Sequence, residues 1–186
     1  MLLLHSWWGL NSAIKKLADR LSDAGFTVLA PDLFSGQTPF DRASAEATLR
    51  DADPNHLAAT TLSALGVLAR QSPPIGIVGL GMGGTLGLWA SVRVPDLVHR
   101  VVSFYGTQTI DFAGSRSAYL IHLAENDPWV TTDDAAFMQA TMGLEGLAVD
   151  LVAYPGTTHG FFEQGDNYNS EAAELAWERT LTFLHL

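Results

Sequence analysis

The chain contains no cysteine, which excludes disulfides, thiolate metal sites and a thiol nucleophile. Basic residues are also few, since 10 Lys and Arg stand against 20 Asp and Glu and give a formal net charge of −10. A surface with this charge repels phosphate backbones and anionic lipid headgroups. We therefore expect neither a nucleic acid nor a membrane as a partner.

Long apolar runs are missing as well. The run from Met1 to Leu4 is short, has no basic residue ahead of it, and leads into His5 and Ser6 instead of a cleavage site. No stretch approaches the roughly 20 apolar residues that a transmembrane helix needs. We expect residues 1–4 to form a strand and the protein to be soluble and cytoplasmic.

The chain does contain enough apolar residues for a core. It has 186 residues, of which 47% are hydrophobic, and this is about the size of one compact domain. No internal repeat, low-complexity tract or linker is present. Residues 1–186 are therefore predicted to form a single domain, with the polar stretch 35–55 as a loose surface excursion.

Apolar periodicity predicts alternating strands and helices. Leu10, Ile14, Leu17 and Leu21 recur at helical steps between two strand-like runs, 2–4 and 26–30. A second helix is expected around 57–68, stopped by Pro73 and Pro74. Further strands are expected at 75–79, 101–105, 118–124 and 149–153, and helices at 85–92, 133–142 and 170–184. This order is typical of an α/β fold with a doubly wound, mostly parallel sheet and helices on both faces.

In such sheets ligands bind beyond the carboxyl ends of the strands, and one of these ends carries a glycine-rich turn. The spacing Gly79-x-Gly81-x-Gly83, between a buried strand and a helix, fits a nucleophile elbow. A working elbow has Ser, Cys or Asp at its centre, whereas Gly81 has no side chain that could attack a substrate.

The same turn also matches a dinucleotide fingerprint, Gly79-x-Gly81-x-x-Gly84. That fingerprint normally follows the first strand and has an acidic residue about 20 positions further on. Neither condition holds here, so nucleotide binding is the remote alternative.

Two further strand ends carry Asp127 and His159. The chain order elbow, acid, histidine is that of the α/β-hydrolase triad, in which the acid orients the histidine and the histidine is the general base. The structural alternative makes Asp127 a cap beside Pro128 and His159 a loop histidine bound to the backbone.

These features together resemble the dienelactone hydrolase family over nearly the whole chain. The resemblance rests on 5–11, on Ala30-Pro-Asp-Leu-Phe34, on the elbow, on Asn126-Asp127 and on His159-Gly-Phe161. It implies an α/β-hydrolase fold, here shortened at its N-terminus, and an oxyanion hole made by the backbone N–H groups of Trp7 and Met82.

The sequence departs from the family at three positions. Members usually have cysteine at the place of Gly81 and glutamate at the place of Ser6, and the two interact. Family enzymes that act on dienelactone also have an arginine a few residues after the histidine, where this chain has Glu163. Dienelactone itself is therefore not the expected substrate.

A triad without its nucleophile keeps a residual acceleration of roughly 10³ to 10⁴ over water. His159 could activate a water molecule in the room left by Gly81, or the Ser6 hydroxyl could attack. A serine at a strand end is, however, more often simply bound to the backbone.

Aromatic residues at the same edge of the sheet indicate an apolar pocket, although several could instead seal the core. The expected substrate-binding residues are Ser6, Trp8, Phe34, Trp129 and Phe161. The remaining histidines lack metal-ligand spacing, so neither a metal nor a cofactor is expected.

Two functions remain open. The first is a hydrolase of small apolar esters or lactones whose activity is weak or lost, and the second is a non-catalytic protein that binds a small ligand or regulates through a degenerate hydrolase site.

Overall fold

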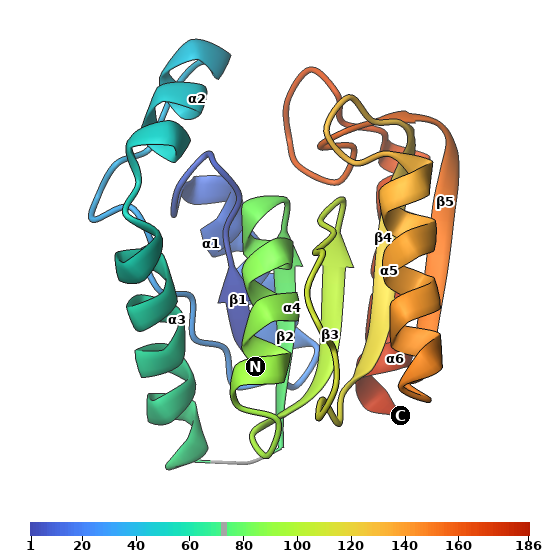
Figure 1. Cartoon of the computed structure of the whole chain (residues 1–186). Coiled ribbons are helices and arrows are strands. Elements are labelled where there is room, and N and C mark those ends of the chain that lie inside the picture. Colours follow the sequence, from blue (N-terminus) through green and yellow to red (C-terminus); the bar gives the residue numbers. More distant parts are fainter. Residues whose placement is uncertain (72–73) are drawn as a thin grey trace.

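A computed structural model describes residues 1–71 and 74–186 and shows a parallel sheet whose strands follow the order β1-β2-β3-β4-β5. Five strands of this kind are what the apolar runs predicted, apart from the run at 26–30. The strands are β1 (Leu2–Leu4), β2 (Ile75–Leu80), β3 (Val98–Phe104), β4 (Ala118–Asn126) and β5 (Val149–Thr158) (Figure 1).

Helices cover both faces of this sheet, as predicted (Figure 1). One face is covered by α1 (Ser12–Asp23) and α6 (Ser170–His185), and the other by α3 (Pro54–Ala69), α4 (Met82–Arg93) and α5 (Thr132–Leu144). Helix α2 (Arg42–Asp51) precedes α3 and extends beyond the carboxyl ends of the strands.

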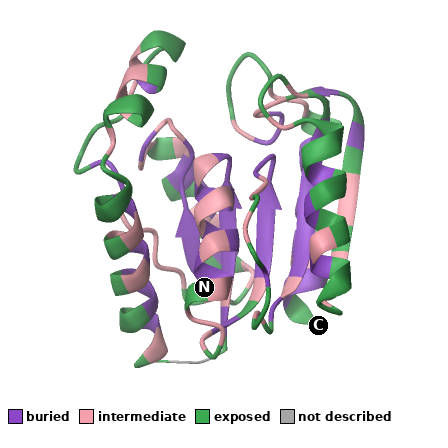
Figure 2. Cartoon of the chain, viewed as in Figure 1, coloured by how far each residue is buried: buried purple, intermediate pink, exposed green. Residues whose placement is uncertain are grey.

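The alternation of side chains along each strand creates two cores. Leu2 and Leu4 pack with residues of α3 and α4, whereas Leu3 points to the opposite face and packs with α1 and α6. Figure 2 shows β1 to β4 mostly buried, whereas the edge strand β5 is largely intermediate or exposed, as are the outer faces of the helices. This pattern explains why the strands read as continuous apolar runs in the sequence.

The first helix confirms its predicted pattern. The Asn11 side chain caps α1 by accepting from the backbone N–H groups of the second and third residues after it, and Ile14, Leu17 and Leu21 are buried. Gly25 follows the helix with a positive φ of 97°. The sequence thus defined both ends of this helix.

Three local expectations need correction or limitation. The run 26–30 is not a strand: it contributes a single bridge, Leu29 to Leu2, in which the Leu29 backbone hydrogen-bonds to Met1 and Leu3. The stretch 35–55 is not simply loose, since α2 forms there with a capping box between Asp41 and Ser44. Helix α3 ends at Ala69, while the predicted stop at Pro73 lies outside the described residues.

The chain changes direction next to β1. After β1 it runs outward to the bridge at Leu29, and it then returns past β1 to build β2, β3, β4 and β5 in order. The carboxyl ends of β1 and β2 therefore flank the switch point where such sheets bind ligands. In the described part of the chain, none of the helices has both the length and the apolar character needed to cross a bilayer.

A buried histidine predicts how stability depends on pH. His122 lies between Tyr154 and Thr180, 2.8 Å from the hydroxyl oxygen of the first and 3.0 Å from that of the second. Burial, reinforced by the charge of Arg179, lowers the pKa of His122 to about 3. Because the unfolded chain takes up this proton first, the free energy of unfolding should fall by about 1.4 kcal/mol per pH unit as the pH drops from about 6.5 towards 3.

Urea titrations at several pH values measure this slope. We expect a shallower slope in His122→Gln than in the parent, whereas His99→Gln, which removes an exposed histidine, should retain the parent's slope. Equal slopes in all three proteins would show that His122 is not the group responsible.

Candidate active site

The strand register brings the predicted residues together in two pairs. Leu4 pairs with Gly79, so Ser6 and Gly81, each two residues further on, lie at the same level. On the neighbouring strands Asn126 pairs with Thr158, which places Asp127 beside His159. Backbone pairing thus determines which side chains can meet at the sheet edge.

The acid and the histidine are hydrogen-bonded. His159 Nδ1 lies 2.7 Å from Asp127 Oδ2, and the Asp127 side chain is only 1% exposed. The other carboxylate oxygen, Oδ1, accepts from the backbone N–H groups of Trp129 and Val130. Asp127 therefore caps its turn and also binds the histidine. With the proton on Nδ1, the lone pair of Nε2 points to the elbow.

Neighbouring groups restrict the His159 ring. The Trp129 ring lies edge-on, 4.7 Å away between centroids, and the Tyr105 ring lies at the same separation. The Asn167 amide donates to the His159 carbonyl at 2.7 Å. The imidazole is therefore packed against two aromatic rings, and its backbone carbonyl is held by a hydrogen bond.

The turn at Gly81 has the shape of an elbow without its side chain. Gly81 adopts φ 51° and ψ −115°, in a region that other residues rarely occupy, and α4 begins at the next residue. A Cβ atom built at this position would lie 3.6 Å from His159 Nε2 and 3.8 Å from Ser6 Cβ. The space for a side chain between the histidine and Ser6 is therefore present.

The two predicted oxyanion donors border this space. Trp7 and Met82 both line the cavity over Gly81. Within residues 1–71 and 74–186, no protein group accepts a hydrogen bond from the backbone N–H of either residue. Both N–H groups are thus available to a substrate oxygen, and their role in catalysis stays a prediction.

Ser6 belongs to a hydrogen-bond network that the sequence did not reveal. Its hydroxyl donates to Glu163 Oε1 at 2.5 Å, and the Tyr105 hydroxyl donates to Glu163 Oε2 at 2.8 Å. Tyr105 has a positive φ of 41°, which is unusual for a residue other than glycine. It directly follows β3, so the rule used for the other strand ends would have identified it. No local signal predicted the position of Glu163.

Burial determines the electrostatics of this network. It raises the pKa of Glu163, while the hydrogen bonds from Ser6 and Tyr105 and the nearby His159 act in the opposite direction. Burial and the charge of Glu163 raise the pKa of Tyr105 well above its usual value. Tyr105 therefore remains a hydrogen-bond donor to Glu163 over the physiological pH range.

His5 fixes the backbone of Ser6. Its Nε2 accepts from the Leu33 N–H at 3.0 Å, so its Nδ1 carries the proton and donates to the Ser6 carbonyl at 2.7 Å. Burial lowers the pKa of His5, which favours this neutral form. The structure thus gives His5 the structural role expected from the sequence.

A cavity of about 290 Å³ opens over Gly81. Of the predicted substrate-binding residues, Ser6 and Trp129 line it. Trp8 lines an adjoining cavity of about 610 Å³, which also borders Trp129 and His159. The remaining lining of the smaller cavity comes from Trp7, Leu49, Met82, Thr85, Tyr105, Gly106, Thr107, Val130 and His159.

Two predicted substrate contacts lie elsewhere. Phe34 is buried in the core beside α3, edge-on to His5. Phe161 is fully buried against Tyr105 and Tyr154 on the opposite face. Their assignment to the pocket was wrong because a strand-end aromatic can turn inward and seal the core, which the sequence pattern does not distinguish. Among the described residues, no group of three or more His, Asp or Glu side chains could hold a metal ion.

Comparisons with known proteins agree with this geometry. The family model described as "Dienelactone hydrolase family" matches residues 1–186. "Protein usf" of Aquifex pyrophilus is 29% identical over 198 residues, covering 98% of this chain and 86% of the relative. A protein from Bradyrhizobium sp, described as "Probable 2-oxo-3-(5-oxofuran-2-ylidene)propanoate lactonase", is 30% identical over 198 residues, covering 95% of this chain and 79% of the relative.

A solved structure shows the same fold. The chain superimposes on a dienelactone hydrolase-like promiscuous phosphotriesterase from metagenomic libraries with a TM-score of 0.85 and 22% identity, covering 100% of this chain and 85% of that chain. The predicted α/β-hydrolase fold is therefore confirmed.

The glycines around the elbow predict a difference in stability. A Cβ at Gly83 would lie 2.3 Å from the Leu4 carbonyl oxygen, and backbone atoms cannot rotate away. Gly83→Ala should lower the free energy of unfolding by about 3 kcal/mol, at the upper end for an overpacked core. Gly66→Ala, in α3 with nothing within 4 Å of the new methyl, should raise it by about 0.5 to 1 kcal/mol.

Chemical denaturation of both variants and the parent tests this difference. A Gly83→Ala protein as stable as Gly66→Ala would show that α4 does not need to approach β1 this closely.

Proposed function

Because the chain belongs to the dienelactone hydrolase family, we propose that it hydrolyses small carboxylic esters or lactones by direct attack of a water molecule activated by His159. The observation that carries this proposal is the open space over Gly81, a cavity that His159 also lines; a Cβ atom at Gly81 would lie 3.6 Å from His159 Nε2. A water oxygen in this space is within reach of a general base whose other nitrogen binds Asp127.

The reaction follows the geometry of the site. The substrate carbonyl oxygen accepts from the backbone N–H groups of Trp7 and Met82, and its carbon faces the water. The water oxygen bonds to that carbon as one water proton moves to His159 Nε2, and Asp127 stabilises the resulting imidazolium. The tetrahedral intermediate then collapses, and the leaving alkoxide takes the proton back from His159. No covalent bond to the protein forms.

The cavity favours a small and uncharged substrate. Its volume is about 290 Å³, and no Asp, Glu, Lys or Arg side chain lines it. Trp7, Leu49 and Trp129 supply apolar walls. The lactonase description of the Bradyrhizobium relative supports a lactone among the possible substrates.

The glycine at the elbow favours a second candidate function. Without a nucleophile at Gly81 the same cavity could serve as a small-ligand site with no chemistry. Saturable binding of esters or lactones without turnover, unchanged by replacement of His159, would support that function over hydrolysis.

Removal of the general base tests the hydrolase function. We expect slow but measurable hydrolysis of p-nitrophenyl acetate and of simple lactones by the parent. His159→Ala should lower kcat/KM by about 100-fold or more, because general base catalysis contributes about 10² to 10⁴. His99→Ala controls for the loss of a histidine. Equal rates in the parent and His159→Ala would contradict the proposal.

Restoring a nucleophile tests whether the hydrolase frame is intact. Gly81→Cys should raise the hydrolysis rate by about 100-fold or more, which is a small part of what a triad nucleophile contributes. Gly81→Ala, which has the Cβ without the thiol, should hydrolyse esters more slowly than the parent because its methyl narrows the space in front of His159 Nε2.

Both substitutions at Gly81 should also lower the free energy of unfolding by about 1 to 3 kcal/mol, since φ is 51° there. Thermal or urea unfolding measures this effect, and unchanged stability in both would argue against a strained elbow.

A further inference from the structure

We propose that Glu163 is a positioning residue that acts through Ser6. Its carboxylate engages the Ser6 hydroxyl proton, so that Ser6 Oγ accepts a hydrogen bond from the hydrolytic water and aims that water at the substrate. This proposal rests on the proposed function, because it concerns the water that His159 activates.

The direction of the hydrogen bond between Ser6 and Glu163 is the first step. A serine hydroxyl has one proton and two lone pairs, whereas an ionised carboxylate only accepts. The distance from Ser6 Oγ to Glu163 Oε1 is 2.5 Å, typical of a charge-assisted bond. The hydroxyl proton of Ser6 is therefore used in the bond to Glu163. With any other group, Ser6 Oγ can only accept a hydrogen bond. The Trp8 N–H contacts one lone pair at 3.4 Å, and a second lone pair remains.

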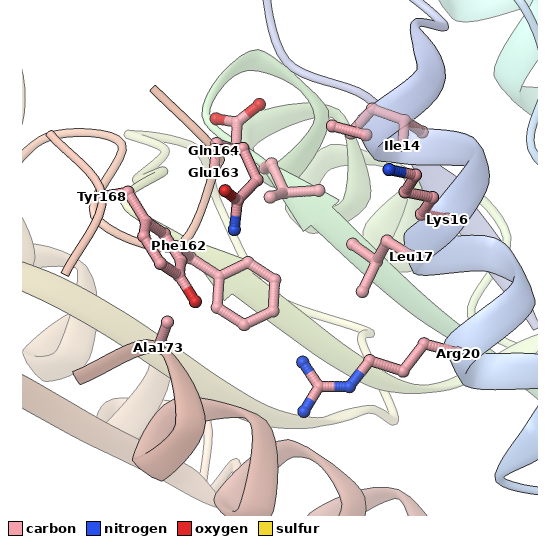
Figure 3. A pocket seen from close by; sticks show the side chains of 11 residues that line it. Ile14, Lys16, Leu17, Arg20, Phe162, Glu163, Gln164, Tyr168 and Ala173 are labelled. Carbon is pink, nitrogen blue, oxygen red and sulfur yellow. The ribbon is translucent and has the colours of Figure 1, made fainter. Parts of the chain in front are cut away.

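The carboxylate is itself fixed in place. Its other oxygen accepts from the Tyr105 hydroxyl at 2.8 Å, and the Glu163 N–H donates to the Gly160 carbonyl at 2.9 Å. Glu163 lines a cavity beside α1, shown in Figure 3 with Leu17 and Phe162 among its lining. Ser6 lines the cavity over Gly81, whereas Glu163 is not among the described residues that line it.

The space at Gly81 lies between the two groups that would hold the water. The ideal Cβ position is 3.6 Å from His159 Nε2 and 3.8 Å from Ser6 Cβ. A water in the cavity over Gly81, which Ser6 and His159 both line, can donate one hydrogen to Nε2 and the other to Ser6 Oγ, which leaves both lone pairs of its oxygen free to attack the carbonyl carbon. If Ser6 instead turned its proton to the water, one of the two lone pairs would be engaged in a hydrogen bond and the water would be a poorer nucleophile.

A double-mutant cycle tests whether Glu163 acts through Ser6. We expect Ser6→Ala and Glu163→Gln each to lower kcat by about tenfold, equivalent to about 1.4 kcal/mol, with KM changed less than about twofold. The amide of Gln can donate to Ser6 and release its proton toward the water. The double variant should be no slower than Ser6→Ala, since Glu163 has nothing left to orient. Ser6→Thr, which keeps the hydroxyl, should recover most of the rate.

The matched control for the lost charge is Glu171→Gln, an exposed residue in the first turn of α6, which should retain the parent's kcat and KM. The proposal would be overturned if the double variant lost kcat by the product of the two single losses. Glu163 would then act independently of Ser6. A rise in KM with unchanged kcat, or no rescue by Ser6→Thr, would do the same.

Crystal structures of the parent and Glu163→Gln separate this proposal from the proposed function. We expect an ordered water within hydrogen-bond distance of both His159 Nε2 and Ser6 Oγ in the parent, and loss of its contact with Ser6 in the variant. Suppose that the parent shows no turnover while the water still loses its contact with Ser6 in Glu163→Gln. In that case the hydrolase function fails and the positioning role of Glu163 stands. A water that keeps the same contacts in both proteins would overturn the positioning role.

Discussion

The close approach of helix α4 to strands β1 and β2 is the contact on which the catalytic edge depends. A Cβ at Gly83 would meet the Leu4 carbonyl oxygen at 2.3 Å, and one at Gly79 would meet the Gly83 carbonyl oxygen at the same distance. Only glycine permits this packing, and it determines where the chain must turn from strand to helix. The positive φ of Gly81 follows from that turn, so the elbow keeps its shape although it presents no nucleophile. Glycine tolerates this backbone at low energetic cost, which fits the proposed hydrolysis without a covalent intermediate.

The rest of the site has the arrangement that the proposed hydrolysis requires. The Asp127 carboxylate holds the His159 proton on Nδ1, and the lone pair of Nε2 faces the space at the elbow. The Glu163 carboxylate accepts hydrogen bonds from the hydroxyl groups of Ser6 and Tyr105. These bonds fix the direction in which both hydroxyl protons point. A site kept only for packing would have no need of an oriented histidine, two free backbone donors and a directed hydroxyl at one edge. Their combination favours activated water over a passive binding pocket.

Much of this arrangement could be predicted from the sequence because it depends on periodicity and strand order. The helix starting after Asn11 and the buried face of α3 follow from apolar spacing alone. The proximity of Asp127 and His159 follows from the rule that parallel strands end at one edge. The strand expected at 26–30 did not form because an apolar run becomes a strand only by backbone pairing with a distant segment, and this run makes a single bridge to β1. Phe34 and Phe161 were misplaced, and Glu163 was missed, because the direction of a loop side chain is set by packing between residues far apart in the sequence.

The most direct test of the account is the first turnover of p-nitrophenyl acetate, followed by rapid mixing and intact-protein mass spectrometry. Direct attack by water predicts that p-nitrophenol appears at its steady rate from the start and that no acetylated protein accumulates. A burst of p-nitrophenol stoichiometric with the protein, together with an acetyl group mapped to Ser6, would contradict the account and identify a serine nucleophile.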